Sequence, residues 1–168
     1  MKILHCIHSA DPESGGTIAA VVSFGPALEG LGHKNVLISL DGPDEAFLQG
    51  LPFPAHGLGP GKTSFGFSPH WRPWLEQNLS EFDRVIIHGL WQYPIYTTPP
   101  VARKKGVPYF VFPHGMLDPW FNRQYPLKRW KKQLYWWFSE HRKLAKASGV
   151  LFTCEEERDL ARQSFYPY

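Results

Sequence analysis

Short apolar runs rich in β-branched residues recur along this chain, and most of them end at a turn that contains Gly, Pro or His. The runs are residues 2–8, 35–40, 55–58, 84–88, 107–112 and 149–153. Helical patterns lie between most of these runs, which predicts an alternation of strands and helices. Three successive apolar residues, Val85, Ile86 and Ile87, are typical of a parallel strand that is buried on both faces. The sequence therefore predicts an α/β fold, a Rossmann-like three-layer α/β/α domain with a mostly parallel sheet.

The length of the chain, 168 residues, predicts one domain with a core of its own. No run of about 18 apolar residues is present, and the first residues do not resemble a signal peptide. Cys6 and Cys154 both lie in apolar runs, which predicts buried, reduced thiols. We therefore expect a cytoplasmic globular domain.

The charges are distributed unevenly along the chain. Residues 1–100 carry 5 basic and 9 acidic side chains, residues 101–150 carry 11 and 2, and residues 151–168 carry 2 and 4. The net charges of the three segments are thus −4, +9 and −2. A cluster of positive charge attracts anions, so the middle segment predicts a partner that carries phosphate groups or an anionic membrane surface.

Gly15, Gly16 and Thr17 follow the first strand and open a helix. Adjacent glycines let the backbone approach a ligand closely, and the first turn of a helix offers unpaired N–H groups to an anion. These residues are therefore candidates for contact with a phosphate group. A tight turn without a ligand is the alternative.

Two histidines stand at the ends of predicted central strands, and each is followed by glycine. They lie in His88-Gly89-Leu90-Trp91 and His114-Gly115-Met116. In parallel sheets, ligands bind outside the carboxyl ends of the strands, where these imidazoles are expected. Each histidine could bind a sugar hydroxyl, stabilise developing charge or move a proton. The alternative is a structural histidine that is bonded to a neighbouring loop.

Residues 126–146 predict one long basic helix. Its apolar stripe, expected to face the core, comprises Leu127, Trp130, Leu134, Trp137, Phe138, His141 and Ala145. The opposite face is expected to expose a mixed basic and aromatic surface made of Lys128, Arg129, Lys132, Trp136 and Lys143. Such a surface predicts contact with an anionic membrane, although a basic face that is simply solvated is the alternative.

Other chemistries find little support in the sequence. Gly61-Lys62-Thr63 resembles the end of a phosphate-binding loop, but His56 stands where the first glycine of that motif belongs. His5 and His8 would point to opposite faces of a strand, which argues against a zinc site. Asp41 could bind a ribose in a nicotinamide-dependent enzyme, but the Gly-x-Gly-x-x-Gly pattern is absent.

Taken together, these motifs resemble the amino-terminal lobe of family 4 glycosyltransferases of the GT-B fold. The resemblance rests on Gly15-Gly16 at a helix start, on His88-Gly89-Leu90-Trp91, and above all on the stretch from Pro113 to Trp120 that reads Pro-His-Gly-Met-Leu-Asp-Pro-Trp. The basic helix and residues 150–157 complete it. The likeness covers nearly the whole chain, residues 1–168, which it implies to be a single lobe of the GT-B fold.

The resemblance implies a retaining transfer of a sugar from a nucleotide-sugar donor to a glycan or lipid-linked acceptor, in cell-surface polysaccharide synthesis. It implies that His114 lies beside the transferred sugar as a catalytic residue. It places Gly15, Gly16 and Thr17 near the donor diphosphate, and Asp11, His88 and Trp91 near the acceptor. The nucleotide sugar is a substrate, and neither a cofactor nor a metal nor a nucleic acid partner is expected.

The lobe that would hold the nucleotide sugar is expected to be absent from this chain, which alone should neither bind the nucleotide tightly nor turn over. The basic segment implies a position at the inner face of the membrane. Two alternatives remain open: a stand-alone module that binds carbohydrate or a membrane surface, and a nicotinamide-dependent Rossmann enzyme.

Overall fold

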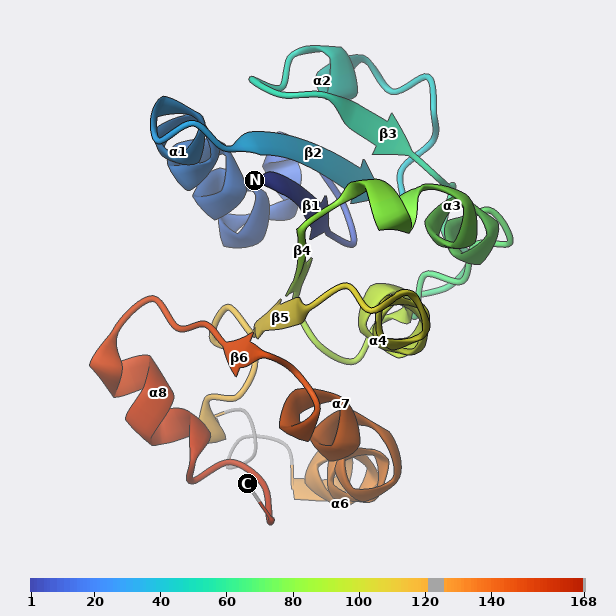
Figure 1. Cartoon of the computed structure of the whole chain (residues 1–168). Coiled ribbons are helices and arrows are strands. Elements are labelled where there is room, and N and C mark those ends of the chain that lie inside the picture. The colour runs from blue at the N-terminus through green and yellow to red at the C-terminus, as the bar shows by residue number, and fades with distance from the viewer. Residues whose placement is uncertain (121–125, 168) are drawn as a thin grey trace.

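A computed structural model gives the architecture of the chain (Figure 1). It describes residues 1–120 and 126–167, with the backbone alone for residues 126–129. The six strands of this part form one parallel sheet in the order β3-β2-β1-β4-β5-β6. The predicted fold class, a Rossmann-like α/β domain, is confirmed.

The strands match the apolar runs of the sequence, although several are shorter than predicted. They are β1 (Lys2–Cys6), β2 (Lys34–Ser39), β3 (Ala55–Gly57), β4 (Arg84–His88), β5 (Tyr109–Phe112) and β6 (Gly149–Val150). Strand β6 is the most shortened relative to the prediction. After it, Leu151 makes one further sheet hydrogen bond, to Val111, before the chain enters the next helix. Cys154 then caps that helix and is exposed, so the prediction of a buried thiol holds for Cys6 and is wrong for Cys154.

Helices cover both faces of the sheet (Figure 1). They are α1 (Gly16–Gly30), α2 (Ala46–Gln49), α3 (Trp71–Asn78), α4 (Tyr93–Lys105), α6 (Pro126–Tyr135), α7 (His141–Ala145) and α8 (Glu155–Ala161), together with the 3-10 turns η1 (Pro12–Ser14) and η2 (Leu79–Glu81) and the π-helical turn η3 (Trp136–Glu140). Helices α1 and α8 lie on one side of the sheet, and α3, α4 and α7 lie on the other. Helix α4 runs through Pro99 and Pro100, where the sequence predicted an interruption, and burial of most of its residues offsets the hydrogen bonds that the prolines cannot make.

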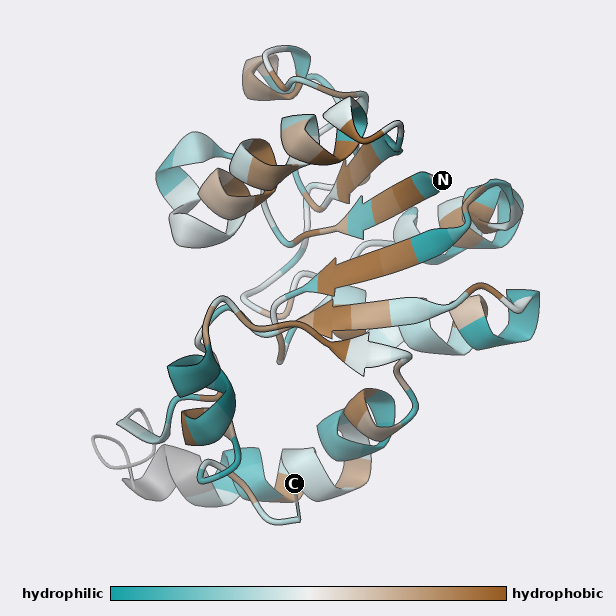
Figure 2. Cartoon of the chain, turned by 60° about the vertical axis from the view of Figure 1, so that its left-hand side comes forward, coloured by the Kyte–Doolittle hydropathy of each residue, from teal (hydrophilic) through white to brown (hydrophobic). Residues whose placement is uncertain are grey.

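The strand register divides the strand residues between two apolar clusters. Leu4, Val85 and Val111 point to the side of α3 and α4, within the larger cluster. The other face, under α1, is made of Leu37, Ile18, Val21 and Phe53 among others. Figure 2 shows the same division as apolar strands between helices of mixed hydropathy. Side chains two residues apart on one strand share a face, so the register also decides where polar side chains of the strands meet.

The segment after residue 125 differs from the single helix that the sequence predicts. Helix α6 passes through the π-helical turn η3 before α7 begins. A π turn inserts one extra residue, so the residues on its two sides no longer share one continuous helical stripe. Trp130, Leu134, Trp137 and Phe138, predicted to face the core, are 70%, 49%, 43% and 74% exposed. The prediction of an apolar core stripe is thus wrong for these four side chains, and the side chain of Leu127 lies outside the described part of the structure.

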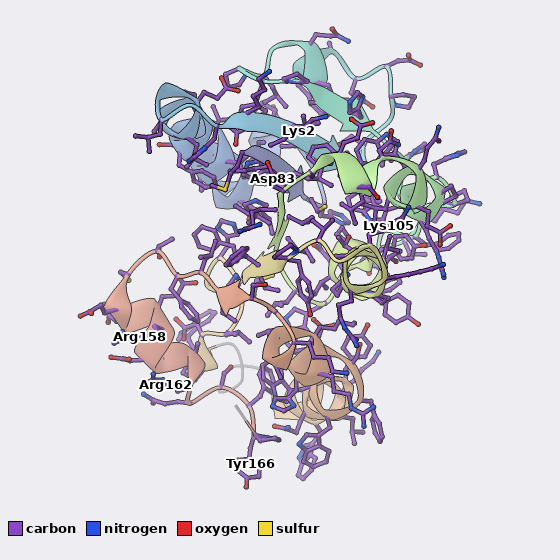
Figure 3. The ribbon with its side chains drawn as sticks, viewed as in Figure 1. Lys2, Asp83, Lys105, Arg158, Arg162 and Tyr166 are labelled. Atoms are coloured by element: carbon purple, nitrogen blue, oxygen red, sulfur yellow. The ribbon has the colours of Figure 1, made fainter. Side chains whose placement is uncertain are left out.

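Trp136 shows the reverse error, because it was predicted at the surface and is only 1% exposed. Its ring stacks on Phe165 with centroids 5.1 Å apart and packs beside Trp91 at 6.2 Å. The indole N–H donates to the carbonyl of Pro167 at 2.6 Å. The end of the described chain thus lies against η3, and Figure 3 shows Tyr166 projecting outward there.

Candidate functional site

The candidate site lies at the carboxyl edge of the sheet, where β1, β4 and the start of α1 meet. A small pocket of about 110 Å³ opens there. Its lining consists of Ile7, His8, Ser9, Ser14, Thr17, His88, Gln92 and Met116. The residues after β1 and β4 thus share one hollow with the first turn of α1, as expected for parallel strands with crossover helices.

Left-handed backbone conformations gather in the loops beside this pocket. His114 has φ of 51° and Trp91 has φ of 68°, and each stands near a glycine that also has positive φ, Gly115 and Gly89. Non-glycine residues rarely adopt this conformation, and those that do are often found at functional sites.

Glu157 holds the loop after β5 in place. One carboxylate oxygen accepts the N–H of Gly115 at 2.7 Å, and the other accepts the N–H and the hydroxyl of Thr153, both at 2.7 Å. Partial burial opposes ionisation of this carboxyl, but the hydrogen bonds from Thr153 and Gly115 lower its pKa. Glu157 therefore ties the turn that carries His114 to the first turn of α8.

Gly15 and Gly16, at the start of α1, have open space around them. Gly15 has φ of 107°, and a Cβ atom built on Gly15 or Gly16 would meet no described atom within 4 Å. Thr17 and Ser14 reach the pocket. The first turn of α1 thus offers its backbone N–H groups beside the pocket, and its positive dipole end favours an anion.

A chain of hydrogen bonds between three histidines runs from the core to this edge. His5 Nδ1 lies 3.1 Å from His88 Nε2, and His88 Nδ1 lies 2.8 Å from His114 Nε2. At the inner end, His5 Nε2 lies 3.0 Å from the Oδ1 atom of Asn35, whose amide donates to the carbonyl of Gly25 at 2.9 Å. We call these four side chains, Asn35, His5, His88 and His114, the histidine chain.

Burial keeps the histidine chain neutral. It lowers the pKa of His5 to about 4, against the opposing effect of the Asn35 hydrogen bond. It lowers the pKa of His114 to about 4 as well, although the nearby Glu157 carboxylate acts in the other direction. Burial, followed by the proximity of His5 and His114, also holds the pKa of His88 well below its ordinary value. At neutral pH all three imidazoles are therefore uncharged.

The two side chains expected beside the acceptor, His88 and Trp91, lie in different surroundings. Both ring nitrogens of His88 are engaged by other histidines, so no nitrogen of His88 is left for an acceptor hydroxyl. Trp91, whose backbone is left-handed, packs against Phe165 and Trp136 and is not part of the pocket lining. Direct contact of His88 and Trp91 with an acceptor therefore stays a prediction, although His88 does line the pocket.

The two candidate aspartates serve their own loops. Asp11 caps the 3-10 turn η1 by accepting the N–H of Glu13 at 2.8 Å. Asp41 accepts the hydroxyl of Ser9 and the N–H of Ala10, each at 2.7 Å. Because both carboxylate oxygens of Asp41 hold the loop after β1, this side chain is occupied as a structural anchor and does not present a free ribose-binding acid.

Sequence reasoning missed His5, Asn35, His8 and Glu157. The available signal for His5 and Asn35 was a polar side chain inside an otherwise apolar strand, where burial demands a partner. His8 lines the pocket, and its Nδ1 atom is buried without a hydrogen-bond partner among the described residues. Glu157 occupies the third position of α8, where a carboxylate completes a helix cap.

The cations predicted to contact a membrane are placed differently from one another. Lys143 is 13% exposed at its side chain and pairs with the buried Glu140 at 3.2 Å, so its prediction as a surface cation is wrong. Lys132 places its Nζ atom 5.2 Å from the ring centroid of Trp91, as a cation–π contact. The side chains of Lys128 and Arg129 lie outside the described part of the structure.

A larger pocket, of about 410 Å³, lies elsewhere, between α4 and the η3–α7 segment. Its lining includes Arg72, Arg103, Arg142 and Lys146. None of the residues at the carboxyl edge that follow β1 or β5 reaches it, so its size does not make it the candidate site. Within residues 1–120 and 126–167, no group of three or more potential ligand side chains is placed to hold a metal ion, and no helix is long and apolar enough to cross a membrane.

Comparison with solved structures shows that this lobe has the fold of half of a GT-B glycosyltransferase. The chain superposes on a crystal structure of Anabaena Alr3699/HepE in complex with UDP and glucose with a TM-score of 0.64 and 16% identity, over 98% of this chain and 41% of that one. For Acinetobacter baumannii MurG the TM-score is 0.50 at 13% identity, over 92% and 42% of the two chains. For a UGT transferase from Siraitia grosvenorii in complex with UDP it is 0.51 at 13% identity, over 98% and 44%.

Residues 15–168 match the family of glycosyl transferase 4-like domains, and the chain belongs to that family. The resemblance predicted from the sequence is thereby confirmed. A comparison with curated proteins gives no match. The chain spans about two fifths of the length of the solved structures that it resembles.

Proposed function

We propose that this lobe forms the acceptor side of a retaining glycosyltransferase in which a second lobe supplies the nucleotide-sugar donor. The observation that carries the proposal is the carboxyl-edge pocket, where the open first turn of α1 and the end of β4 lie beside the His114 turn. The Anabaena and Siraitia proteins, which share this fold, were crystallised with UDP. Their chains also have the length for a second lobe.

The residues of the edge suit the charges of the reaction. Breaking the bond between sugar and diphosphate leaves negative charge on the phosphate and positive character on the sugar. The backbone N–H groups of Gly16 and Thr17, with the dipole of α1 behind them, would stabilise the phosphate. The flexible backbone of Gly15 would let it approach closely. His114, neutral at pH 7, would contact the transferred sugar.

The acceptor is proposed to be a glycan or a lipid-linked glycan of cell-surface polysaccharide synthesis, held by the loop that contains Ser9 and Asp11. For a lipid-linked acceptor, we propose a membrane contact through exposed cationic and aromatic side chains between residues 130 and 146. We call them the basic–aromatic patch, and they are the exposed side chains Trp130, Lys131, Trp137, Phe138, Arg142 and Lys146.

The proposal is tested by replacing His114 in a protein that joins this lobe to a donor lobe. His114→Ala should lower kcat at least 100-fold if the imidazole acts in the transition state. His70→Ala, at an exposed histidine outside the site, is the matched control and should leave kcat unchanged. Equal turnover of His114→Ala and the wild type would remove His114 from the reaction.

A stand-alone module that binds carbohydrate or a membrane surface is the second candidate, and the exposed aromatic side chains of the basic–aromatic patch favour it. The two candidate functions differ in whether the lobe requires a donor lobe for binding and activity. The transferase lobe alone should bind UDP-sugars weakly and show no turnover, and a donor lobe should restore both. A module would bind its glycan or vesicle unaided, and a donor lobe would add no activity.

A further inference from the structure

The hydrogen bonds of the histidine chain all depend on one amide. The carbonyl of Gly25 has no hydrogen to donate, so the Asn35 group that faces it at 2.9 Å is the NH₂ group. The other end of the Asn35 amide is then its oxygen, which faces His5 Nε2 at 3.0 Å. An amide oxygen only accepts hydrogen bonds, and His5 Nε2 therefore carries its proton.

From this end, the position of each proton along the chain is determined. A neutral imidazole with its proton on Nε2 has an acceptor at Nδ1, so His5 Nδ1 accepts a hydrogen bond from His88 Nε2. In the same way His88 Nδ1 accepts from His114 Nε2, at 2.8 Å. The opposite set of tautomers would turn the Asn35 oxygen toward the Gly25 carbonyl, where two acceptors would face each other in a buried site.

We propose that Asn35 and His5, acting through His88, are positioning residues that hold His114 in the Nε2–H tautomer and present its Nδ1 atom as a hydrogen-bond acceptor. This Nδ1 atom is the one ring nitrogen of the histidine chain without a hydrogen-bond partner in the described part of the molecule. The ligand that it suits is a hydroxyl donor, such as a sugar hydroxyl. Only this last step rests on the proposed function, because the tautomer is set by the fold.

The histidine chain works as a tautomer lock and does not conduct a proton away. A proton taken up at His114 could pass inward through His88 to His5, but the Asn35 amide oxygen beyond it is too weak a base to accept it. The charge would then rest on a buried imidazole that faces the rings of Phe24 and Phe53 and no carboxylate. The Glu157 carboxylate acts at the outer end, on His114, and is not among the groups that shift the pKa of His5 or His88.

The direct test is the tautomer of each histidine in the isolated chain. Two-bond ¹H–¹⁵N correlation spectra of the histidine-labelled protein at pH 7 distinguish the protonated ring nitrogen from the bare one. We expect His5, His88 and His114 all to carry the proton on Nε2. A proton on Nδ1 of His114, or an even mixture of its tautomers, would overturn the proposal, and this result depends on no ligand and no activity.

The variant Asn35→Leu replaces the amide by an apolar group with the same branching of heavy atoms. His5 then has no fixed acceptor at Nε2, so the nitrogen shifts of His114 should move toward the average of the two tautomers. Ser39→Ala, at a buried side chain of the same strand outside the histidine chain, is the matched control and should leave the shifts unchanged. A folded Asn35→Leu protein with the wild-type tautomer at His114 would refute the role of Asn35. If the variant does not fold, the wild-type spectrum still decides.

Turnover of the two-lobed protein supplies a second readout. Asn35→Leu should lower kcat about tenfold in the wild type and have no further effect when His114 is already Ala, because it acts only through that imidazole. Additive losses would show a general structural role and contradict the proposal. If His114→Ala itself leaves kcat unchanged, the proposed role of His114 in the reaction fails while the tautomer result stands.

Discussion

The histidine chain and the α6–η3–α7 segment are both dense in aromatic and titratable side chains, yet their side chains are oriented by different means. In the histidine chain, parallel pairing sets the orientation, because the register places Asn35 beside Ile3 and His5 beside Ile86 on one face of the sheet. In the α6–η3–α7 segment, the π-helical turn η3 sets it. A sheet register is shared by many hydrogen bonds, whereas one inserted residue changes which face of a helix is buried.

The largest effect on stability is expected from the buried residue of the helical segment. Trp136→Ala should lower the free energy of unfolding by about 3–5 kcal/mol, because it empties the space beside Phe165 and removes a partly buried hydrogen bond. Denaturant unfolding of the isolated chain measures this loss. Trp137→Ala is the matched control. The Trp137 side chain is 43% exposed, and its removal should lower the free energy of unfolding by less than about 1 kcal/mol.

Equal losses for the two tryptophans would contradict the position of the π turn. A larger loss for Trp137 would mean that the stripe predicted from the sequence does face the core. The comparison therefore tests the one feature of this segment that periodicity did not predict.

The histidine chain should make stability depend on pH. The pKa of His5 is about 4 in the folded chain and near 6.5 when unfolded, so the unfolded state binds a proton that the folded state refuses. The free energy of unfolding is therefore unaffected by His5 above about pH 6.5 and decreases as the pH falls toward 4. The decrease is about 3 kcal/mol for His5 alone. His114, whose pKa is shifted in the same direction, adds to the loss.

Denaturant unfolding at a series of pH values between 7 and 4 measures this dependence. His5→Gln should flatten the curve, since it removes one group that must charge on unfolding. His70→Ala, which removes an exposed histidine, should leave the slope as it is. A wild-type stability that stays constant between pH 6.5 and 5 would contradict the neutral, buried histidine chain.

The sequence predicts the sheet well because a strand that is buried on both faces is a continuous run of apolar residues. Val85, Ile86 and Ile87 read as a central strand, and the His-Gly turns after β4 and β5 lie at the carboxyl edge as expected. What the sequence does not contain is the register between strands. Without it, His5 and Asn35 are isolated polar residues, and nothing indicates that they meet His88.

Two further features of the site depend on contacts between distant segments. Glu157 reaches back to Gly115, 42 residues earlier in the chain, and only the folded loop shows that it holds the His114 turn. Trp91 has a left-handed backbone conformation that its residue type disfavours, and it packs against Trp136 of η3. Tertiary packing sets both features, and local propensity does not report them.

The smallest effect on stability, and a separate effect on binding, is expected at the basic–aromatic patch. Trp137 and Phe138 are exposed on η3, and the cations Arg142 and Lys146 of the following segment are exposed as well. Aromatic rings next to cations suit the interface of an anionic bilayer, where the rings insert and the charges meet the headgroups. Their removal should therefore weaken binding to vesicles while the fold stays intact.

Co-sedimentation with vesicles of mixed anionic and neutral lipid measures this binding. The double variant Trp137→Ala with Phe138→Ala should bind about tenfold more weakly than the wild type, and added salt should weaken both. Leu31→Ala, at an exposed apolar side chain of the loop after α1, is the control and should bind as the wild type does. No binding at low salt, or equal binding by the double variant, would contradict membrane contact through the basic–aromatic patch. The exposure of Trp137 and Phe138 would then need another binding partner as its explanation.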